Sequence, residues 1–296
     1  MLKQTRPLVA ALLAIAASLG LGQNQARAAE GPAVWEMRGP SANIMLLGSV
    51  HLLRESDYPL PDNIVRAMER AACLVFELDM DDLDPLISQT LFQNLGRVPE
   101  GTSLADILGP GNYAVASEKS RELGIELDLL SEFRPWFAAL TIMNLQLMRL
   151  GFVPQLGLDQ QLAADAVSAG KEVTGLETLE FQIELFDGMP DPVQVQLLMQ
   201  TLQEAHLLED QMGVLVGAWR DGDTDILARE LGRNFSEYPD LYRSLVTERN
   251  ASWAKQIIEL GNGDRECLVV VGALHLVGKG SLIDLLREKG AEVVRW

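Results

Sequence analysis

The chain of 296 residues is 48% hydrophobic and 6% aromatic, with a mean hydropathy of +0.08, which excludes a disordered or fibrous protein. Its formal net charge is −18, and basic residues form no cluster in it. Binding to nucleic acid is therefore not expected, because contact with a phosphate backbone requires lysine and arginine side chains that displace counterions.

The first 28 residues have the composition of a secretory signal peptide. Basic residues precede an apolar run from Leu8 to Leu21, and the sequence Ala-Arg-Ala that ends at Ala28 provides a cleavage site. We therefore expect residues 1–28 to be removed and a periplasmic or secreted mature protein to comprise residues 29–296. No later apolar stretch reaches the roughly 20 residues that a membrane-spanning helix requires.

The beginning of the mature chain predicts a strand-helix-strand unit. Continuous apolar runs over Asn43–His51 and Cys73–Leu78 have the length of buried strands. A helix is expected between them, with Asp62 as its N-cap and apolar residues at helical spacing. Two buried strands joined by a helical crossover are typical of a parallel sheet.

The middle of the chain is predicted to be mostly helical. Apolar residues recur at intervals of three and four over Pro135–Arg149 and over Pro192–Trp219. Two short strands, Ile125–Leu129 and Lys171–Gly175, are expected to interrupt these helices. Because no Pro-rich or Ser-rich linker separates independent domains, we interpret the segment from about 131 to 248 as a helical insertion in a single domain.

The end of the chain repeats the pattern of its beginning. A helix over Arg249–Leu260 leads to a buried strand, Cys267–Gly272, and a helix over Ser281–Lys289 leads to a last strand, Ala291–Arg295. The predicted fold class is therefore α/β, with a mainly parallel central sheet, strand-Gly-x-x-His-helix-strand units at both ends and a large helical insertion.

Two of the three histidines follow a glycine by three positions, each at the carboxyl end of a predicted strand. The motifs are Gly48-Ser-Val-His51 and Gly272-Ala-Leu-His275. Glycine permits a close approach of backbone or ligand where the chain leaves the sheet, and open parallel sheets bind ligands beyond these strand ends. We expect both histidines to belong to one site, with helix capping as the alternative. The third, His206, is expected at the surface.

Two glutamates occupy the corresponding ends of two other strands. Glu77 ends the run Leu-Val-Phe-Glu, and Glu177 follows the strand Lys171–Gly175. Burial of a carboxylate is costly unless a metal, an arginine or a proton compensates its charge. Two imidazoles with one or two carboxylates suit a divalent metal ion such as manganese, cobalt or zinc. The alternatives are an ion pair between Glu77 and Arg249, and a helix N-terminal role for Glu177.

Other polar residues are less specific. Arg249 and Asn250 open a helix, from which the arginine could grip a carboxylate or polarise a carbonyl. Asp159 is interpreted as a helix N-cap. Serine hydrolases, P-loop enzymes and ordinary zinc proteases lose their main support, because the sequence contains none of their motifs.

The two cysteines lie near the starts of two predicted strands. If those strands are parallel neighbours, Cys73 and Cys267 lie at the same edge of the sheet, and an exported protein would oxidise them to a disulfide. Two buried thiols are the alternative.

These motifs together resemble the TraB/GumN family of exported bacterial proteins. The resemblance covers about residues 33–296 and rests on the paired Gly-x-x-His motifs with the sequences Phe76-Glu77-Leu, Gly157-Leu-Asp159, Gly175-Leu-Glu177-Thr178 and Arg249-Asn250-x-x-Trp253. The family is similar to the animal Tiki proteins, which are metal-dependent proteases that trim Wnt ligands, and more remotely to erythromycin esterase and the haem-binding ChaN proteins. The resemblance implies that the site residues are His51, Glu77, Glu177 and His275, supported by Arg249 and Asn250.

Three hypotheses follow. In the first, the protein is an exported metal-dependent peptidase: His51 and His275 bind the metal with one glutamate, the other glutamate is the general base, and Arg249 stabilises the oxyanion. In the second, the same residues activate water without a metal, as in an esterase. In the third, the protein binds a peptide, a metal or haem without turnover. The expected partner is a peptide or protein substrate, and the sequence leaves the oligomeric state open.

Overall fold

The computed structural model describes residues 31–79, 85–233 and 239–296. The predicted leader, residues 1–28, lies outside the described residues. Within the described ranges, no helix combines the length and the apolar composition needed to cross a membrane.

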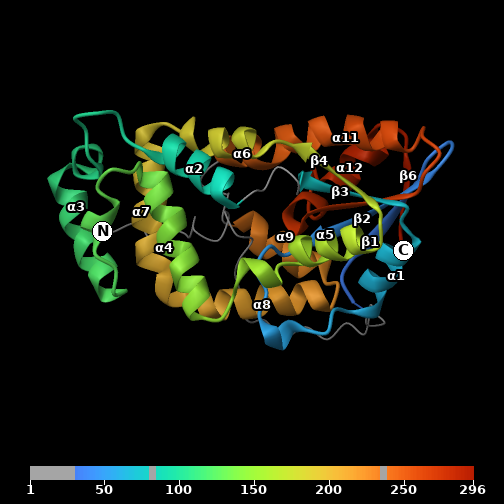
Figure 1. The fold of residues 1–296 in the computed structure, drawn as a ribbon, viewed down its shortest axis with the longest axis horizontal. Helices are drawn as coiled ribbons and strands as arrows, with labels where there is room; N and C mark the ends of the chain where they lie inside the picture. Colours follow the sequence, from blue (N-terminus) through green and yellow to red (C-terminus); the bar gives the residue numbers. More distant parts are fainter. Residues whose placement is uncertain (1–30, 80–84, 234–238) are drawn as a thin grey trace.

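A six-stranded mixed sheet occupies one end of the molecule (Figure 1). The strand order is β4-β3-β5-β2-β1-β6, and the first four of these run parallel, whereas β1 is antiparallel to both of its neighbours. The strands are β1 (Val34–Arg38), β2 (Asn43–Ser49), β3 (Cys73–Leu78), β4 (Glu172–Glu177), β5 (Cys267–Gly272) and β6 (Glu292–Arg295). The structure therefore confirms the predicted α/β fold with a mainly parallel sheet.

Helices cover both faces of this sheet. Figure 1 shows α11 (Glu248–Leu260) and α12 (Leu282–Glu288) on one face, and α1 (Asp62–Arg70) and α5 (Leu158–Ser168) on the other. Because both faces are covered, β2, β3 and β5 are buried along nearly their whole length. This burial explains why their sequences are continuously apolar instead of alternating.

The other end of the molecule is helical (Figure 1). Helices α4 and α7 pack against each other there, and α3 packs against α7. The helices between the strands are α2 (Pro85–Gly96), α3 (Leu104–Glu122), α4 (Pro135–Arg149), α6 (Leu179–Asp187), α7 (Asp191–Glu204), α8 (Leu208–Arg220), α9 (Thr224–Arg233) and α10 (Pro239–Tyr242). Helices α2 and α3 precede residue 131, where the predicted insertion begins.

The structure differs from the sequence-based expectations in three places. Ile125–Leu129 is not a strand: Leu127–Leu130 form a 3₁₀ turn that packs beside α3, because apolar residues three apart share one face of such a turn. The stretch Pro192–Trp219 is two helices, α7 and α8, separated by a 3₁₀ turn that contains the exposed His206. The strand β1 was not predicted. Two of its five residues are charged, and no helical crossover connects it to the next strand, β2.

The cysteines form a disulfide between β3 and β5. Cys73 and Cys267 are direct partners in the parallel register, and their Cα atoms lie 4.6 Å apart. The bond joins residues 194 positions apart in the sequence. It thus ties the two halves of the sheet together at the amino ends of these strands.

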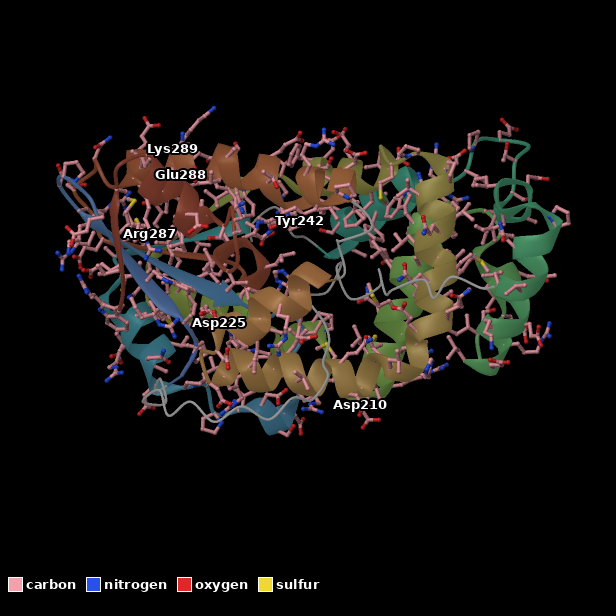
Figure 2. All side chains as sticks on the ribbon, turned by 180° about the vertical axis from the view of Figure 1, so that it is seen from behind. Asp210, Asp225, Tyr242, Arg287, Glu288 and Lys289 are labelled. Atoms are coloured by element: carbon pink, nitrogen blue, oxygen red, sulfur yellow. A yellow bond between two sulfur atoms is a disulfide. The ribbon has the colours of Figure 1, made fainter. Side chains whose placement is uncertain are left out.

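Many charged residues lie at the surface of the molecule. Figure 2 labels Asp210 on α8 and Asp225 on α9, together with Arg287 and Glu288 in the last turn of α12 and Lys289 directly after it. All five are exposed. Part of the excess of acidic residues in this chain is therefore exposed to solvent.

Candidate functional site

The carboxyl ends of four neighbouring parallel strands meet at one edge of the sheet. Glu177 is the last residue of β4, Glu77 is the fifth of six in β3, and Gly272 ends β5. His51 follows the end of β2 by two residues, and His275 lies in the 3₁₀ turn after β5. The parallel topology therefore brings all four predicted ligand residues to the same edge.

Each glycine of the two motifs lies so close to residues of the other motif that a side chain would not fit there. A Cβ atom at Gly272 would lie 3.3 Å from Nε2 of His51 and 3.2 Å from Oε1 of Glu77. A Cβ atom at Gly48 would lie 3.0 Å from Cα of Ala273 in the second motif. Contacts this short are tighter than those of most real Cβ atoms, so a side chain at either position would push its neighbours apart.

A buried ion-pair cluster forms the centre of the site. Nη2 of Arg249 lies 2.6 Å from Oε2 of Glu77 and 2.8 Å from Oε2 of Glu177, and Nε lies 3.0 Å from the latter oxygen. All three side chains are at most 11% exposed. This is the ion pair that the sequence offered as the alternative to metal ligation by Glu77, and it includes Glu177 as well. The guanidinium also lies over the ring of Trp253, 4.6 Å from the ring centre.

All five N–H donors of Arg249 are engaged within this cluster. Besides the two glutamates, Nη1 donates to the carbonyl oxygen of Leu245 and to Nε2 of His275, each at 3.2 Å. A guanidinium has no further donor to offer. The predicted role of Arg249 as an oxyanion donor stays a prediction, and it would require one of these hydrogen bonds to be released.

The second histidine is held as a neutral ring. Because arginine can only donate, Nε2 of His275 accepts, and Nδ1 carries the proton that it donates to Oδ1 of Asn250 at 2.7 Å. Burial lowers the pKa of His275 to about 3; the charge of Glu77 opposes this effect and that of Arg249 adds to it. His275 is thus neutral across the physiological range, and Asn250 sets its tautomer.

The first histidine pairs with an aspartate that had a different predicted role. Nδ1 of His51 lies 2.8 Å from Oδ2 of Asp159. The His51 side chain is 51% exposed, whereas that of Asp159 is 11% exposed. The charge of Asp159 raises the pKa of His51 to about 9 against the opposing effect of desolvation, with a smaller contribution from Glu77.

Asp159 is not the N-cap of α5. The cap is Gly157, and Asp159 is the second residue of the helix, with its side chain turned to His51 instead of its own backbone. A Cβ atom at Gly157 would lie 2.1 Å from the carbonyl oxygen of His51, so only glycine lets α5 start this close to the motif.

Glu77 is ionised by its surroundings. It accepts a hydrogen bond from the backbone N–H of Gly272 at 2.7 Å. Although burial raises the pKa of Glu77, the positive charges of Arg249 and of His51, together with this hydrogen bond, lower it well below its usual range. The carboxylate is therefore a fixed negative charge beside His51.

Gln182 links the two glutamates and had no sequence signal. Its amide nitrogen donates to Oε2 of Glu77 at 3.2 Å and to Oε2 of Glu177 at 3.3 Å. It lies on α6, whose N-cap is Thr178. Glu177 directly precedes this cap, and its carboxylate is directed to Arg249 and Gln182.

A cavity of about 260 Å³ opens beside this cluster. It is lined by His51, Glu77, Leu78, Pro154, Asp159, Gln160 and Gln182. Asp159 and Gln160 belong to the first turn of α5, so the positive end of that helix dipole lies at the cavity wall. A substrate bound here would contact His51 and Glu77 but not the buried His275.

The donor groups do not fit the predicted manganese, cobalt or zinc site. Among the described residues, no three His, Cys, Asp or Glu side chains are placed to hold one metal ion. Arg249 occupies the oxygens of Glu177 and one oxygen of Glu77, and it faces Nε2 of His275. A divalent cation bound to these atoms would be repelled by the guanidinium at close range.

The comparisons with known proteins agree on one family. The sequence profile of the TraB/PrgY/gumN family matches residues 33–295. The chain is 29% identical to the uncharacterized protein YbaP of Escherichia coli K12 over 242 residues, which is 82% of this chain and 87% of YbaP. An uncharacterized protein of Treponema pallidum is 23% identical over 271 residues, 86% of this chain and 80% of its own. No solved structure matches. The chain therefore belongs to the TraB/PrgY/gumN family.

Proposed function

We propose that this protein is an exported hydrolase in which His51 activates water for attack on a peptide carbonyl, without a metal ion. The observation that carries the proposal is the contact of 2.8 Å between His51 and Asp159 at the wall of the 260 Å³ cavity. Asp159 holds Nδ1, and within the described residues Nε2 has no hydrogen-bond partner. Nε2 is therefore the ring atom available to a water molecule.

In the proposed reaction, one proton moves from water to His51 and then from His51 to the leaving amine. Neutral His51 accepts a proton at Nε2 from the water whose oxygen attacks the carbonyl carbon. The carbonyl carbon–nitrogen bond then breaks, and the imidazolium returns the proton to the leaving amine. Asp159 and Glu77 stabilise the imidazolium between these two steps, because the charge of each raises the pKa of His51. The first turn of α5 lines the same cavity, and the positive end of its dipole would stabilise an oxyanion that develops beside it.

The buried cluster serves as the frame of this site. Arg249 binds Glu77 and Glu177 at 2.6 and 2.8 Å. It also donates a hydrogen bond to His275, which in turn is fixed by its hydrogen bond to Asn250. We assign positioning roles to these residues. A rigid second layer of this kind is what keeps a general base and its charge partner in a productive geometry.

Two further observations support the details of the proposal. The disulfide between Cys73 and Cys267 is the form that cysteines take in an oxidising compartment, which supports export together with the leader-like residues 1–28. The choice of a peptide substrate rests on the resemblance to the Tiki proteases. An ester substrate would use the same groups.

The test is a digest of unfolded protein by the chain purified after export with its own leader. Mass spectrometry of a reduced, alkylated protein mixture would report the cleaved bonds. We expect cleavage by the wild type, none by the variant His51→Ala, and full cleavage by the matched control His206→Ala, since His206 is exposed and does not line the cavity. Equal cleavage by His51→Ala would refute the assignment. Peptides that are retained but returned uncleaved would indicate a binding protein.

A further inference from the structure

The two ends of the amide group of Gln182 have different surroundings. Its nitrogen lies between two carboxylates of the ion-pair cluster, 3.2 Å from Oε2 of Glu77 and 3.3 Å from Oε2 of Glu177. An ionised carboxylate only accepts hydrogen bonds, so the atom that faces it must be the NH₂ group and not the carbonyl oxygen. The orientation of this amide is therefore fixed, and Oε1 is left for another contact.

Gln182 also belongs to the wall of the 260 Å³ cavity. Nη2 of Arg249 bridges the same two carboxylate oxygens at 2.6 and 2.8 Å, but Arg249 does not line the cavity. The arginine thus binds the glutamates from the interior, and Gln182 binds them from the cavity side. Among the described residues, Oε1 of Gln182 has no hydrogen-bond partner. It is a free acceptor on a side chain of the cavity wall.

The other polar atoms at this wall are mostly acceptors too. Only Oδ2 of Asp159 contacts His51, and Oδ1 has no hydrogen-bond partner among the described residues. Nε2 of His51 is an acceptor whenever the ring is neutral, which is its reactive form in the proposed reaction. Of the other described residues that line the cavity, only Gln160 adds a side-chain donor, because Leu78 and Pro154 are apolar. The cavity therefore suits a ligand that brings its own N–H donor.

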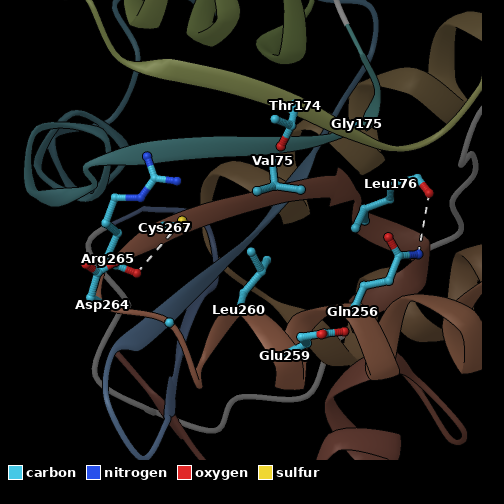
Figure 3. Close-up of a pocket in the computed structure, with 11 residues that line it drawn as sticks. Val75, Thr174, Gly175, Leu176, Gln256, Glu259, Leu260, Asp264, Arg265 and Cys267 are labelled. Atoms are coloured by element: carbon cyan, nitrogen blue, oxygen red, sulfur yellow. Dashed lines mark hydrogen bonds between the residues drawn. The ribbon is translucent and has the colours of Figure 1, made fainter.

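A second cavity, of about 380 Å³, lies between the sheet and α11 (Figure 3). It has no lining residue in common with the cavity at His51. Its wall includes Gln256, whose amide nitrogen donates to the carbonyl oxygen of Leu176 at 3.4 Å, the contact drawn as a dashed line in Figure 3. Gln256 is therefore a second glutamine with an engaged nitrogen on a cavity wall, away from His51, and it serves as a matched control for Gln182.

An acceptor at the position of Gln182 distinguishes amides from esters. A secondary amide carries an N–H group beside its carbonyl, from which Oε1 can accept a hydrogen bond. An ester has an oxygen in that place, whose lone pairs would face those of Oε1. A site that is built to bind an N–H group discriminates against the analogue that lacks it, because the acceptor of the protein then stays without a partner.

We propose that Oε1 of Gln182 binds an N–H group of the substrate, and that Gln182 thereby makes the cavity selective for amides over esters. The assignment of the bound molecule as substrate rests on the proposed function, whereas recognition of the N–H group needs no turnover. Gln182 is then a specificity-determining residue. It holds the two glutamates through its nitrogen and the substrate through its oxygen.

The experiment measures binding to the variant His51→Ala, so that turnover plays no part. The probes are the N-methylamide, the N,N-dimethylamide and the methyl ester of 4-methylpentanoic acid, of which only the first has an N–H group. Their apolar chain suits the surface of Leu78 and Pro154. NMR titrations of the protein give the dissociation constants. We expect the N-methylamide to bind about tenfold more tightly than the other two probes, since only it satisfies the acceptor.

Further substitutions in the same variant provide the controls. Gln182→Lys removes the carbonyl oxygen but keeps an N–H donor for Glu77 and Glu177, so we expect a folded protein that binds the three probes equally. Gln182→Met removes both polar groups and should also abolish the preference. Gln256→Met makes the same change in the second cavity and should retain the preference. Melting temperatures check that each variant is folded.

The outcomes separate this selectivity from the hydrolase itself. Equal binding of the three probes to His51→Ala would overturn the selectivity, and so would a preference for the N-methylamide that survives in Gln182→Lys. A preference that Gln256→Met also abolishes would show an indirect effect and would overturn it as well. If the preference depends on Gln182 but the wild type cleaves no peptide, the hydrolase is refuted and recognition of the N–H group stands. If the wild type cleaves peptides and the probes bind equally, the hydrolase stands without this selectivity.

Discussion

Nδ1 of His51 lies 2.8 Å from Oδ2 of Asp159, although the two residues are 108 positions apart in the sequence. The contact exists because Gly157 lets the start of α5 lie against the carbonyl oxygen of His51. It turns a half-exposed histidine into a candidate general base with a defined proton position.

The first prediction concerns the pH dependence of the reaction. A protonated His51 cannot accept a proton from water, and its pKa is raised to about 9, so kcat/KM should rise with pH up to about 9. In Asp159→Asn the main charge that raises this pKa is lost, so the rising limb should move to lower pH. A pH–rate profile of both proteins, with NMR titration of the His51 ring, measures the shift. A limb that stays in place would mean that Asp159 does not set the pKa.

The second prediction concerns the stability of the buried cluster. Arg249→Met leaves the carboxylates of Glu77 and Glu177 buried without a partner, which should cost about 3–5 kcal/mol. The triple variant with Glu77→Gln and Glu177→Gln removes the unpaired charges and should recover part of the loss. Urea unfolding of the three proteins gives the free energies. If Arg249→Met were as stable as the wild type, the carboxylates would have to be solvated or protonated in that variant.

The third prediction concerns the glycine of the second motif. Gly272→Ala places a methyl group 3.3 Å from Nε2 of His51 and 3.2 Å from Oε1 of Glu77, so it should reduce turnover strongly. Gly213→Ala is the matched control, since it lies in α8 with no atom within 4 Å of the added Cβ, and it should retain activity and gain about 0.5–1 kcal/mol. Comparison of kcat and melting temperature separates a local effect from unfolding. Unchanged kcat in Gly272→Ala would argue against reaction in this cavity.

The fourth prediction concerns metal removal. Because Arg249 holds the carboxylates, dialysis against a strong chelator should leave turnover unchanged. Elemental mass spectrometry before and after dialysis checks that metal has been removed. Activity that disappears and returns with manganese, cobalt or zinc would restore the metal-dependent hypothesis and would require Arg249 to move away from the glutamates.

The sequence predicted those parts of the site that follow from strand ends. Glu77, Glu177 and the two Gly-x-x-His motifs terminate apolar runs, and parallel topology is sufficient to bring them together. The residues that contact these side chains were harder to predict from the sequence. The pairing of Arg249 with Glu77 stood as an alternative, because burial cost alone does not distinguish an arginine from a metal.

The contacts that helices α5 and α6 contribute to the site could not be predicted from the sequence. Gln182 depends on how α6 is placed over the ends of β3 and β4, and an isolated glutamine carries no pattern of its own. Asp159 matched the composition of a helix start, so the local interpretation prevailed over a contact with a residue 108 positions away. The prediction of a strand at Ile125–Leu129 was wrong because it also rested on local sequence alone. A short apolar run suits a strand and a 3₁₀ turn equally well.

The glycine that makes room for His51 belongs to the motif at the other end of the chain. During synthesis, the first motif is complete after residue 51, yet Gly272, Arg249 and His275 follow only some two hundred residues later. A nascent chain that is truncated anywhere in between carries a histidine without its frame. The candidate site is therefore complete only once residue 275 has been made, and a chain that stops before Gly272 lacks half of the residues around His51.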